Sequence, residues 1–184
     1  KKTMPEDIYR AEVLGEWVDG GGSVFKNIDN YCVLPEWRPY QYGKRYYAGI
    51  DVGRQLDFSV LTILDDEGNV VFIYRDNNKP WDTILNNMIQ YLNQYKPTAM
   101  MEVNGIGDPL YDQIQQKYKD IHPFLTTNQS KQQIIEDLIY QLNTGDLRLP
   151  TEDLFRPLYN ELQTFSYSYS PTTRRVQYKA ISNA

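Results

Sequence analysis

Three successive stretches in the middle of the chain are short, mostly apolar runs. Residues 46–52, 58–64 and 70–75 are rich in aromatic and β-branched side chains, which predicts three β-strands. The Asp-Asp-Glu-Gly-Asn stretch at 65–69 predicts a tight turn between the last two strands. Residues 82–95 then place apolar side chains at helical spacing, so the pattern changes from strand to helix.

The same reasoning extends to both ends of the chain. A helix over 5–18 and a connector over 24–45, with one short strand at 23–28, are expected before the first long strand. After 95 the pattern predicts strand 98–103, a helix with Asp108 as its N-cap, strand 121–127, a helix from Ser130 to Gly145, a helix over 157–165 and a hairpin over 164–180.

This order of elements favours an α/β fold with a mixed central sheet. Three strands in sequence, followed by alternating helices and strands, suit a ribonuclease-H-like arrangement of about five main strands, flanked by helices and completed by a C-terminal hairpin. In that arrangement the fourth strand lies parallel beside the first.

Composition narrows the classes of protein to consider. The chain has 184 residues, of which 41% are hydrophobic and 14% aromatic, enough for a domain with a substantial core. A mean hydropathy of -0.62 and the lack of a long apolar run exclude a membrane span. The net charge of -5 argues against non-specific coating of nucleic acid, although a local basic stripe remains compatible with it. A single cysteine, Cys32, fits a reducing compartment.

Two carboxylates stand out because they interrupt apolar strands near their C-terminal ends. Asp51 lies near the C-terminal end of the first long strand and Glu102 near that of the fourth, and each strand is followed by a glycine-containing turn. If these strands are parallel neighbours, the two side chains could hold one divalent cation between them. The alternative is that each acid is a hydrogen-bonded residue beside a turn. The pattern leaves both interpretations open.

Other charged residues are weaker candidates. Asp57 could be a further carboxylate of the site or could cap its turn, and Asp108 could contribute to the site from outside the metal ligands or serve only as a helix cap. The candidate phosphate contacts are basic residues that could equally be solvated surface charge: Lys131, Arg174, Arg175 and Lys179.

Five segments, in order, resemble one family over nearly the whole chain: IYRAEVLGEWVDGGGSVF, YYAGIDVGRQLDFSVLTILD, AMMEVNGIGDPLYDQI, SKQQIIEDLIYQLNTGDLRLP and LYNELQTFSYSYSPTTRRVQYKAIS. They are similar to the C-terminal part of the phage terminase large subunit, in which an ATPase motor precedes a ribonuclease-H-like nuclease. The resemblance implies that residues 1–45 are the end of the motor and its linker. It implies that residues 46–184 are the nuclease domain, without its C-terminal helix.

The resemblance also implies an activity. In that family the domain is a metal-dependent endonuclease that cuts concatemeric viral DNA, with a two-metal site for Mg²⁺ or Mn²⁺. Asp51 matches the family's first metal-binding aspartate, Glu102 its second acid, and Asp57 a further acid that recurs in the family's first motif. The family's third acid, in a His-Asp-Asp type motif, is expected beyond Ala184, and without it this chain is expected to bind metal weakly.

The partners implied by the resemblance are double-stranded DNA, the terminase small subunit, the portal protein and the ATPase domain of the same full-length chain, with no membrane. The implied location is the host cytoplasm, docked on the procapsid portal. Two alternatives stay open. One is an actin/Hsp70-like nucleotide-binding module, since residues 49–60 also look like a phosphate-binding hairpin. The other is a non-catalytic ribonuclease-H-like interaction domain.

Overall fold

The structure is a computed structural model that describes residues 21–53, 57–105, 107–170 and 175–180. It divides into two compact units, one formed by Trp37–Thr127 and the other by Lys1–Glu36 together with Asn128–Ala184. The helix expected over 5–18 lies outside the described residues. Among the described helices, none combines the length and the apolar character that crossing a bilayer requires.

A five-stranded mixed sheet is the centre of the unit Trp37–Thr127. Its order is β5-β4-β3-β6-β7. The strands are β3 (Tyr46–Asp51), β4 (Ser59–Asp65), β5 (Val70–Asp76), β6 (Thr98–Glu102) and β7 (Ile121–Phe124). The first three pair antiparallel, whereas β6 pairs parallel with β3 and β7 parallel with β6. The prediction that the fourth strand returns parallel to the first is therefore confirmed.

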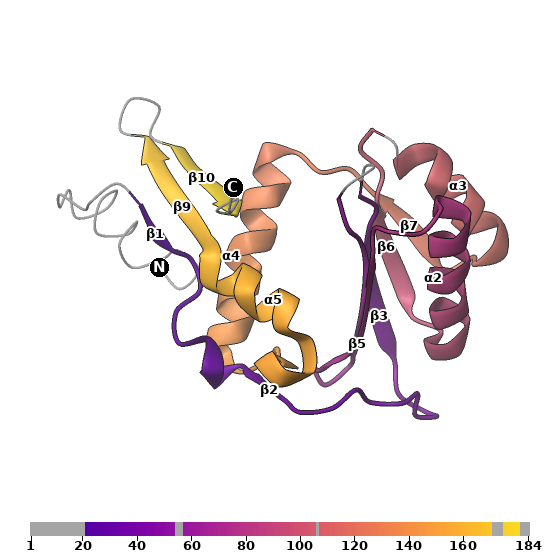
Figure 1. The fold of residues 1–184 in the computed structure, drawn as a ribbon, viewed down its shortest axis with the longest axis horizontal. Helices are drawn as coiled ribbons and strands as arrows, with labels where there is room; N and C mark the ends of the chain where they lie inside the picture. Colours follow the sequence, from indigo (N-terminus) through magenta and orange to yellow (C-terminus); the bar gives the residue numbers. More distant parts are fainter. Residues whose placement is uncertain (1–20, 54–56, 106, 171–174, 181–184) are drawn as a thin grey trace. The chain divides into compact units, whose positions relative to one another are not determined.

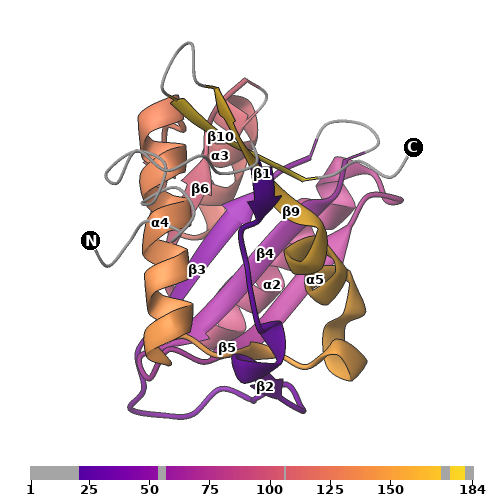
Figure 2. The ribbon, with the colours of Figure 1, turned by 90° about the vertical axis from the view of Figure 1, so that its left-hand side faces the viewer.

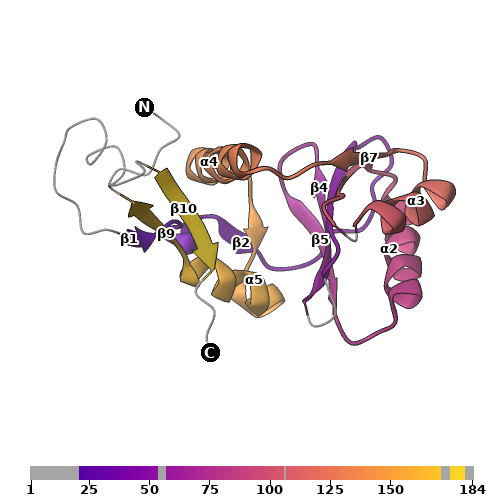
Figure 3. The ribbon, with the colours of Figure 1, turned by 90° about the horizontal axis from the view of Figure 1, so that it is seen from above.

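Two helices cover one face of this sheet, α2 (Trp81–Tyr95) and α3 (Gly107–Lys117), as Figures 1 and 3 show. The buried side of α2 carries the apolar residues that its sequence spacing predicted: Ile84, Leu85, Met88, Ile89 and Leu92. The sheet meets them with apolar side chains from three strands: Ala48, Ile50, Leu61, Ile63 and Met101. Burial of this apolar face is the main stabilising contribution to the unit.

The strand β3 alternates strictly between buried and exposed positions. Ala48 and Ile50 point toward the helices, whereas Gly49 and Asp51 lie on the other face. Figure 2 looks onto that other face of the sheet, where β3, β4 and β5 lie side by side. The strand pattern therefore places the Asp51 side chain away from the apolar core.

The second unit combines the two ends of the chain. Its helices are α4 (Asn128–Thr144) and α5 (Glu152–Thr164), together with the short 3-10 helix η1 (Ile28–Asn30). A three-stranded sheet pairs β9 (Phe165–Ser170) with β10 (Arg175–Ala180) and with β1 (Gly21–Ser23), which confirms the predicted hairpin. A parallel pair, β2 (Cys32–Leu34) with β8 (Leu149–Pro150), completes the unit.

Short strands were the least predictable elements. The strand expected at 23–28 is wrong in position, because β1 ends at Ser23 and residues 28–30 form η1 instead. The strands β2 and β8 were not predicted at all. Segments of two or three residues show no period of their own and exist through their partners, as β1 does against β9.

Helix starts also differ from the sequence expectation. The N-cap assignments of Asp108 and Ser130 are wrong, because α3 begins at Gly107 and α4 at Asn128. The helix expected over 157–165 is present as the second part of α5, which is interrupted at Phe155 by a non-helical conformation. Pro157 lies in the first turn after this interruption, where its missing N–H costs no helical hydrogen bond. The helical residues before Phe155 were not predicted. The predicted end of α4 is confirmed by Gly145, which has a φ of +77°.

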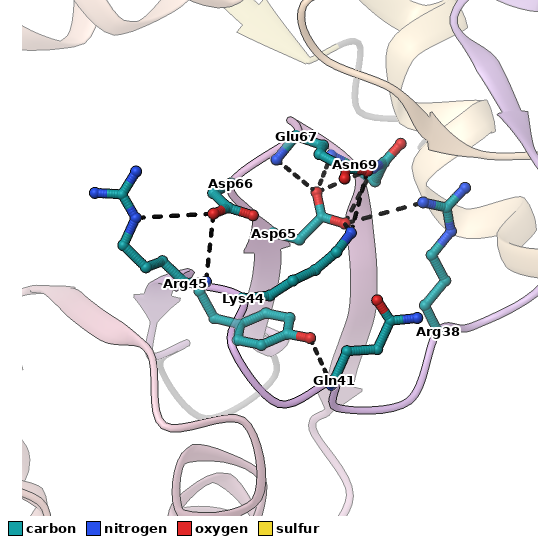
Figure 4. A network of polar contacts seen from close by, with 9 residues as sticks. Arg38, Gln41, Lys44, Arg45, Asp65, Asp66, Glu67 and Asn69 are labelled. Atoms are coloured by element: carbon teal, nitrogen blue, oxygen red, sulfur yellow. Dashed lines mark hydrogen bonds and ion pairs between the residues drawn. The ribbon is translucent and has the colours of Figure 1, made fainter.

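A buried carboxylate fixes the turn between β4 and β5 (Figure 4). Asp65 is only 3% exposed. Its Oδ1 accepts hydrogen bonds from the backbone N–H groups of Asn69 at 2.9 Å and Glu67 at 3.1 Å, and from the Asn69 side-chain amide at 3.0 Å. Lys44 Nζ lies 3.3 Å from Oδ2. The charge is thus paired and hydrogen-bonded, which a buried carboxylate requires.

The same network ties the segment before β3 to the sheet. Besides Lys44, Arg38 lies near Asp65, with 3.9 Å between Nη1 and Oδ2. The backbone N–H of Arg38 donates to the Val71 carbonyl at 3.1 Å, and Tyr95 Oη donates to the Arg38 carbonyl at 2.8 Å. Residues 38–44 are therefore held where β3 begins and β4 ends.

Replacement of this carboxylate should destabilise the fold. We expect Asp65→Ala to lower the free energy of unfolding by about 3 kcal/mol near neutral pH, because it leaves buried donors without an acceptor. Asp66→Ala is the matched control. Its side chain is 27% exposed and pairs with Arg45 at 3.7 Å, so we expect a loss of less than about 1 kcal/mol in urea unfolding.

The effect should depend on pH in one direction. Burial alone would raise the pKa of Asp65, but the hydrogen bonds from Asn69 and Lys44 outweigh it and hold the pKa below its ordinary value. A lowered pKa in the folded state stabilises the protein above about pH 4 and loses that contribution as the pH falls through the folded pKa. The difference between wild type and Asp65→Ala should shrink below about pH 3; an equal difference at both pH values would contradict the assignment.

Candidate active site

The pairing of β3 with β6 brings two carboxylates together at adjacent strand ends. Ile50 lies opposite Met101 in the parallel register, and Asp51 and Glu102 are the next residues on each strand. Neighbouring strands are about 4.8 Å apart. The structure therefore places these two acids side by side at the C-terminal edge, as their sequence positions predicted.

A pocket of about 340 Å³ opens at this edge. It is lined by Asp51, Val52, Gly53, Asp57, Phe58, Glu102 and Asn104. Asp57 is thus part of the same pocket, although it lies in the β3–β4 loop and not on a strand. The sequence left open whether Asp57 belonged to the site, and the structure brings it to the other two acids.

The two described ends of the segment between β3 and β4 lie close together. The Gly53 N–H donates to Ser59 Oγ at 3.2 Å, and Ser59 is only 1% exposed. A Cβ atom at position 53 would lie 2.4 Å from the carbonyl oxygen of Asp57. Only glycine allows this approach of backbone to backbone, and the approach is what carries Asp57 to the pocket.

Asn104 was not foreseen from the sequence. Its Nδ2 donates to the Thr126 carbonyl at 2.8 Å and its Oδ1 accepts from the Thr126 N–H at 2.7 Å. The amide thus holds the loop after β6 against the chain that leaves β7. The residues around Asn104 predicted a loop. Its partner, Thr126, lies 22 residues further along the chain, so the local sequence did not predict the role of the side chain.

The surroundings of Asp51 disfavour its negative charge. Burial of its carboxyl raises the pKa of Asp51 above its ordinary value, and the negative charges of Glu102 and Asp57 raise it further. The side chain still reaches solvent at the pocket. A site of this kind favours a cation, because a divalent ion relieves repulsion that the described pocket residues do not themselves neutralise.

The donor set fits a hard divalent cation. Carboxylate oxygens from Asp51, Asp57 and Glu102, with the Asn104 amide nearby, are the oxygen ligands that Mg²⁺ prefers. Within the ranges that the structure describes, however, no three His, Cys, Asp or Glu side chains are close enough to hold an ion together. The backbone of Asp108 lies in α3, and its side chain lies outside the described residues. Its contribution to the site remains a prediction.

The expected phosphate contacts belong to the other unit of the chain. Lys131 is exposed on α4, and the backbones of Arg175 and Lys179 lie in β10, whereas the acidic pocket lies within Trp37–Thr127. Arg174 lies outside the described residues. A role for these four residues in binding nucleic acid remains a prediction.

Comparisons with known proteins give a consistent result. No protein-family profile matches the chain. The terminase large subunit of Thermus virus P23-45 is 25% identical to it over 175 residues, which cover 89% of this chain and 36% of the relative. The chain thus spans about a third of the length of the curated relatives it matches.

Solved structures agree in fold. The magnesium-bound large terminase nuclease of the thermophilic phage G20c superposes with a TM-score of 0.77 at 22% identity, covering 88% of this chain and 89% of that one. The nuclease domain of the Thermus phage P74-26 large terminase gives a TM-score of 0.75 at 22% identity, with 89% and 88% covered. The expected resemblance to large-terminase nuclease domains is confirmed. The ribonuclease-H-like α/β fold class is confirmed with it. The G20c large-terminase nuclease is also known with bound cobalt and with bound zinc.

The two glycines of β3 and its loop provide a matched test of the pocket. We expect Gly53→Ala to lower the free energy of unfolding by about 2 kcal/mol, because the new methyl group forces the Asp57 backbone away. Gly49→Ala, where a Cβ meets nothing within 4 Å, should change it by less than about 0.5 kcal/mol. Urea unfolding measures both. Equal losses in the two variants would show that the loop tolerates the shift.

Removing one charge from the pocket should stabilise the metal-free protein. The pKa of Asp51 is raised in the folded state, so its carboxyl group does not destabilise the protein below the unfolded pKa of about 4. As the pH rises through the folded pKa, ionisation of Asp51 lowers the free energy of unfolding. Asp51→Asn should therefore raise the melting temperature near neutral pH in EDTA, with no gain below about pH 4. Added Mg²⁺ should stabilise the wild type and not the variant.

The control for this experiment is Asp112→Asn, which removes an exposed carboxylate on α3. It should shift neither melting temperature nor Mg²⁺ response. A gain equal to that of Asp51→Asn would mean that the general negative charge of the chain, and not the pocket, sets the effect.

Proposed function

We propose that this chain is the nuclease part of a terminase large subunit and hydrolyses phosphodiester bonds of double-stranded viral DNA during genome packaging. The observation that carries the proposal is the pocket where Asp51 and Glu102 end two adjacent parallel strands and Asp57 joins them. Carboxylates on neighbouring strand ends are suited to hold ions against a phosphate group.

The proposed chemistry divides between the protein and the ions. Asp51, Glu102 and Asp57 would hold Mg²⁺ or Mn²⁺, proposed as a two-metal site, with their carboxylate oxygens. Such ions would supply Lewis-acid chemistry at the phosphate and at the attacking water. Asn104 keeps the loop after β6 in place through its two bonds to Thr126. The products expected of such hydrolysis are a 3′-hydroxyl and a 5′-phosphate.

The comparisons support the proposal at a coarser level. The relatives are terminase large subunits, and the similar G20c protein is named as a nuclease that binds magnesium, cobalt or zinc. The chain covers only 36% of the length of the curated relative. Its partners are therefore proposed on the assumption that it is part of a complete terminase large subunit. We propose double-stranded DNA, the small subunit, the portal protein and an ATPase domain of the same chain as those partners, in the host cytoplasm at the procapsid portal.

A non-catalytic interaction domain is the second candidate. It is favoured by one observation, the lack of a three-ligand metal group among the residues that the structure describes. The proposed nuclease requires that a bound ion draw the pocket acids together or that a further acid complete the site. No comparison described above favours the actin/Hsp70-like alternative.

Plasmid nicking in Mn²⁺ separates these candidates. We expect the wild-type chain, and more strongly a natural chain extended past Ala184, to nick supercoiled DNA, and Asp51→Ala to lower the rate roughly 100-fold or more because an ion ligand is lost. Asp112→Ala, on the exposed side of α3, should nick at the wild-type rate.

Two other outcomes would count against the nuclease. Equal nicking by Asp51→Ala would place the cleavage elsewhere, for example in a contaminant. No nicking by any chain, combined with no Mn²⁺-dependent rise in melting temperature, would favour the interaction domain.

A further inference from the structure

The acidic pocket has a cation against one of its walls. The wall is Phe58, a pocket residue that is 38% exposed. The guanidinium carbon of Arg75 lies 3.2 Å from the centre of the Phe58 ring. Among the residues that the structure describes, the pocket lining includes three carboxylates and neither lysine nor arginine. Arg75 therefore supplies positive charge where the described pocket residues have none.

The strand register explains how Arg75 reaches this position. Asp51 lies opposite Val60 on β4, and Val60 lies opposite Arg75 on β5. Residues paired across strands project from the same face, so Arg75 shares the face of Asp51, two strands or about 10 Å away. Phe58 directly precedes β4 at its pocket end, and the side chain of Arg75 extends toward that end to lie over the ring.

Stacking on an aromatic ring suits the guanidinium group for a particular task. The planar face of the group packs on the ring, whereas the five N–H donors lie in its plane and point outward at its edge. This geometry favours bidentate binding of a phosphate, and the ring restricts the rotamers of a long side chain before the ligand arrives. A lysine in the same place would provide the charge, but it could neither stack a planar group on the ring nor donate two parallel hydrogen bonds to one phosphate.

We propose that Arg75, positioned by Phe58, binds a backbone phosphate of the nucleic-acid substrate. This phosphate lies on the same strand as the phosphate that enters the acidic pocket, and next to it. The proposal rests on the nuclease function proposed above and adds a substrate-binding residue from β5 to it. Arg75 holds the flanking phosphate, so the strand can approach three carboxylates without facing unbalanced negative charge.

Fluorescence anisotropy of a labelled DNA duplex, with Ca²⁺ as the divalent ion, tests the contact without relying on cleavage. Removing one phosphate contact should lower the slope of log Kd against log salt concentration by about 0.9. We expect Arg75→Gln to show this decrease and to bind roughly tenfold more weakly. Phe58→Leu keeps the apolar wall and the charge, so it should retain the wild-type slope but bind several-fold more weakly.

The matched control is Arg45→Gln, which removes the same charge from the residue that precedes β3, at the opposite end of that strand from Asp51. Arg45 is 79% exposed and pairs with Asp66, so its loss should change Kd by less than about twofold. Far-ultraviolet circular dichroism and melting temperature establish that each variant is folded. If Arg75→Gln does not fold, Phe58→Leu decides, because wild-type affinity in that variant overturns the positioning role.

The outcomes separate the two proposals. Wild-type DNA binding with an Arg75→Gln slope equal to that of Arg45→Gln would overturn the Arg75 contact and leave the nuclease intact. No DNA binding by the wild-type chain in Ca²⁺ would overturn both the contact and the nuclease function on which it rests.

Discussion

The parallel register of β3 with β6 is the constraint on which the site depends. Because Ile50 lies opposite Met101, and both are buried under the helices, the two acids that follow them emerge together on the opposite face. Side chains alternate along a strand, so a slip of one residue would turn Asp51 toward the core and expose Ile50. The apolar packing of the sheet against α2 and α3 thus sets the position of the charged groups, although no buried residue of this core is among the described residues that line the pocket.

The long elements could be predicted from the sequence because their burial is one-sided and regular. The alternation in β3 and the helical spacing in α2 both report a face that meets the core. The same regularity made the strand-end carboxylates visible, since a charge that interrupts an apolar run needs a reason. Asp51 and Glu102 could therefore be paired before the structure was known.

What could not be predicted depends on contacts between distant parts of the chain. The turn containing Asp65 is readable as a turn, but its pairing with Lys44 exists only in the folded unit. The same holds for the two hydrogen bonds between Asn104 and Thr126, and for short strands that exist only through their partners. Contacts between residues far apart in the chain produce no periodic pattern in the local sequence. The features that depend on such contacts are the ones that were predicted wrongly or not at all.

The bonds of Asn104 also have a mechanical meaning. The chain passes between the two units at two places, after Glu36 and after Thr127. The first crossing enters the sheet through Arg38, at the end of β3 remote from Asp51. The second leaves directly from Thr126, whose backbone is fastened on both sides to a residue of the acidic pocket. The first crossing is therefore anchored at the end of the sheet remote from the pocket, whereas the second is anchored beside the pocket, by the pairing of β7 with β6 and by the two Asn104–Thr126 hydrogen bonds.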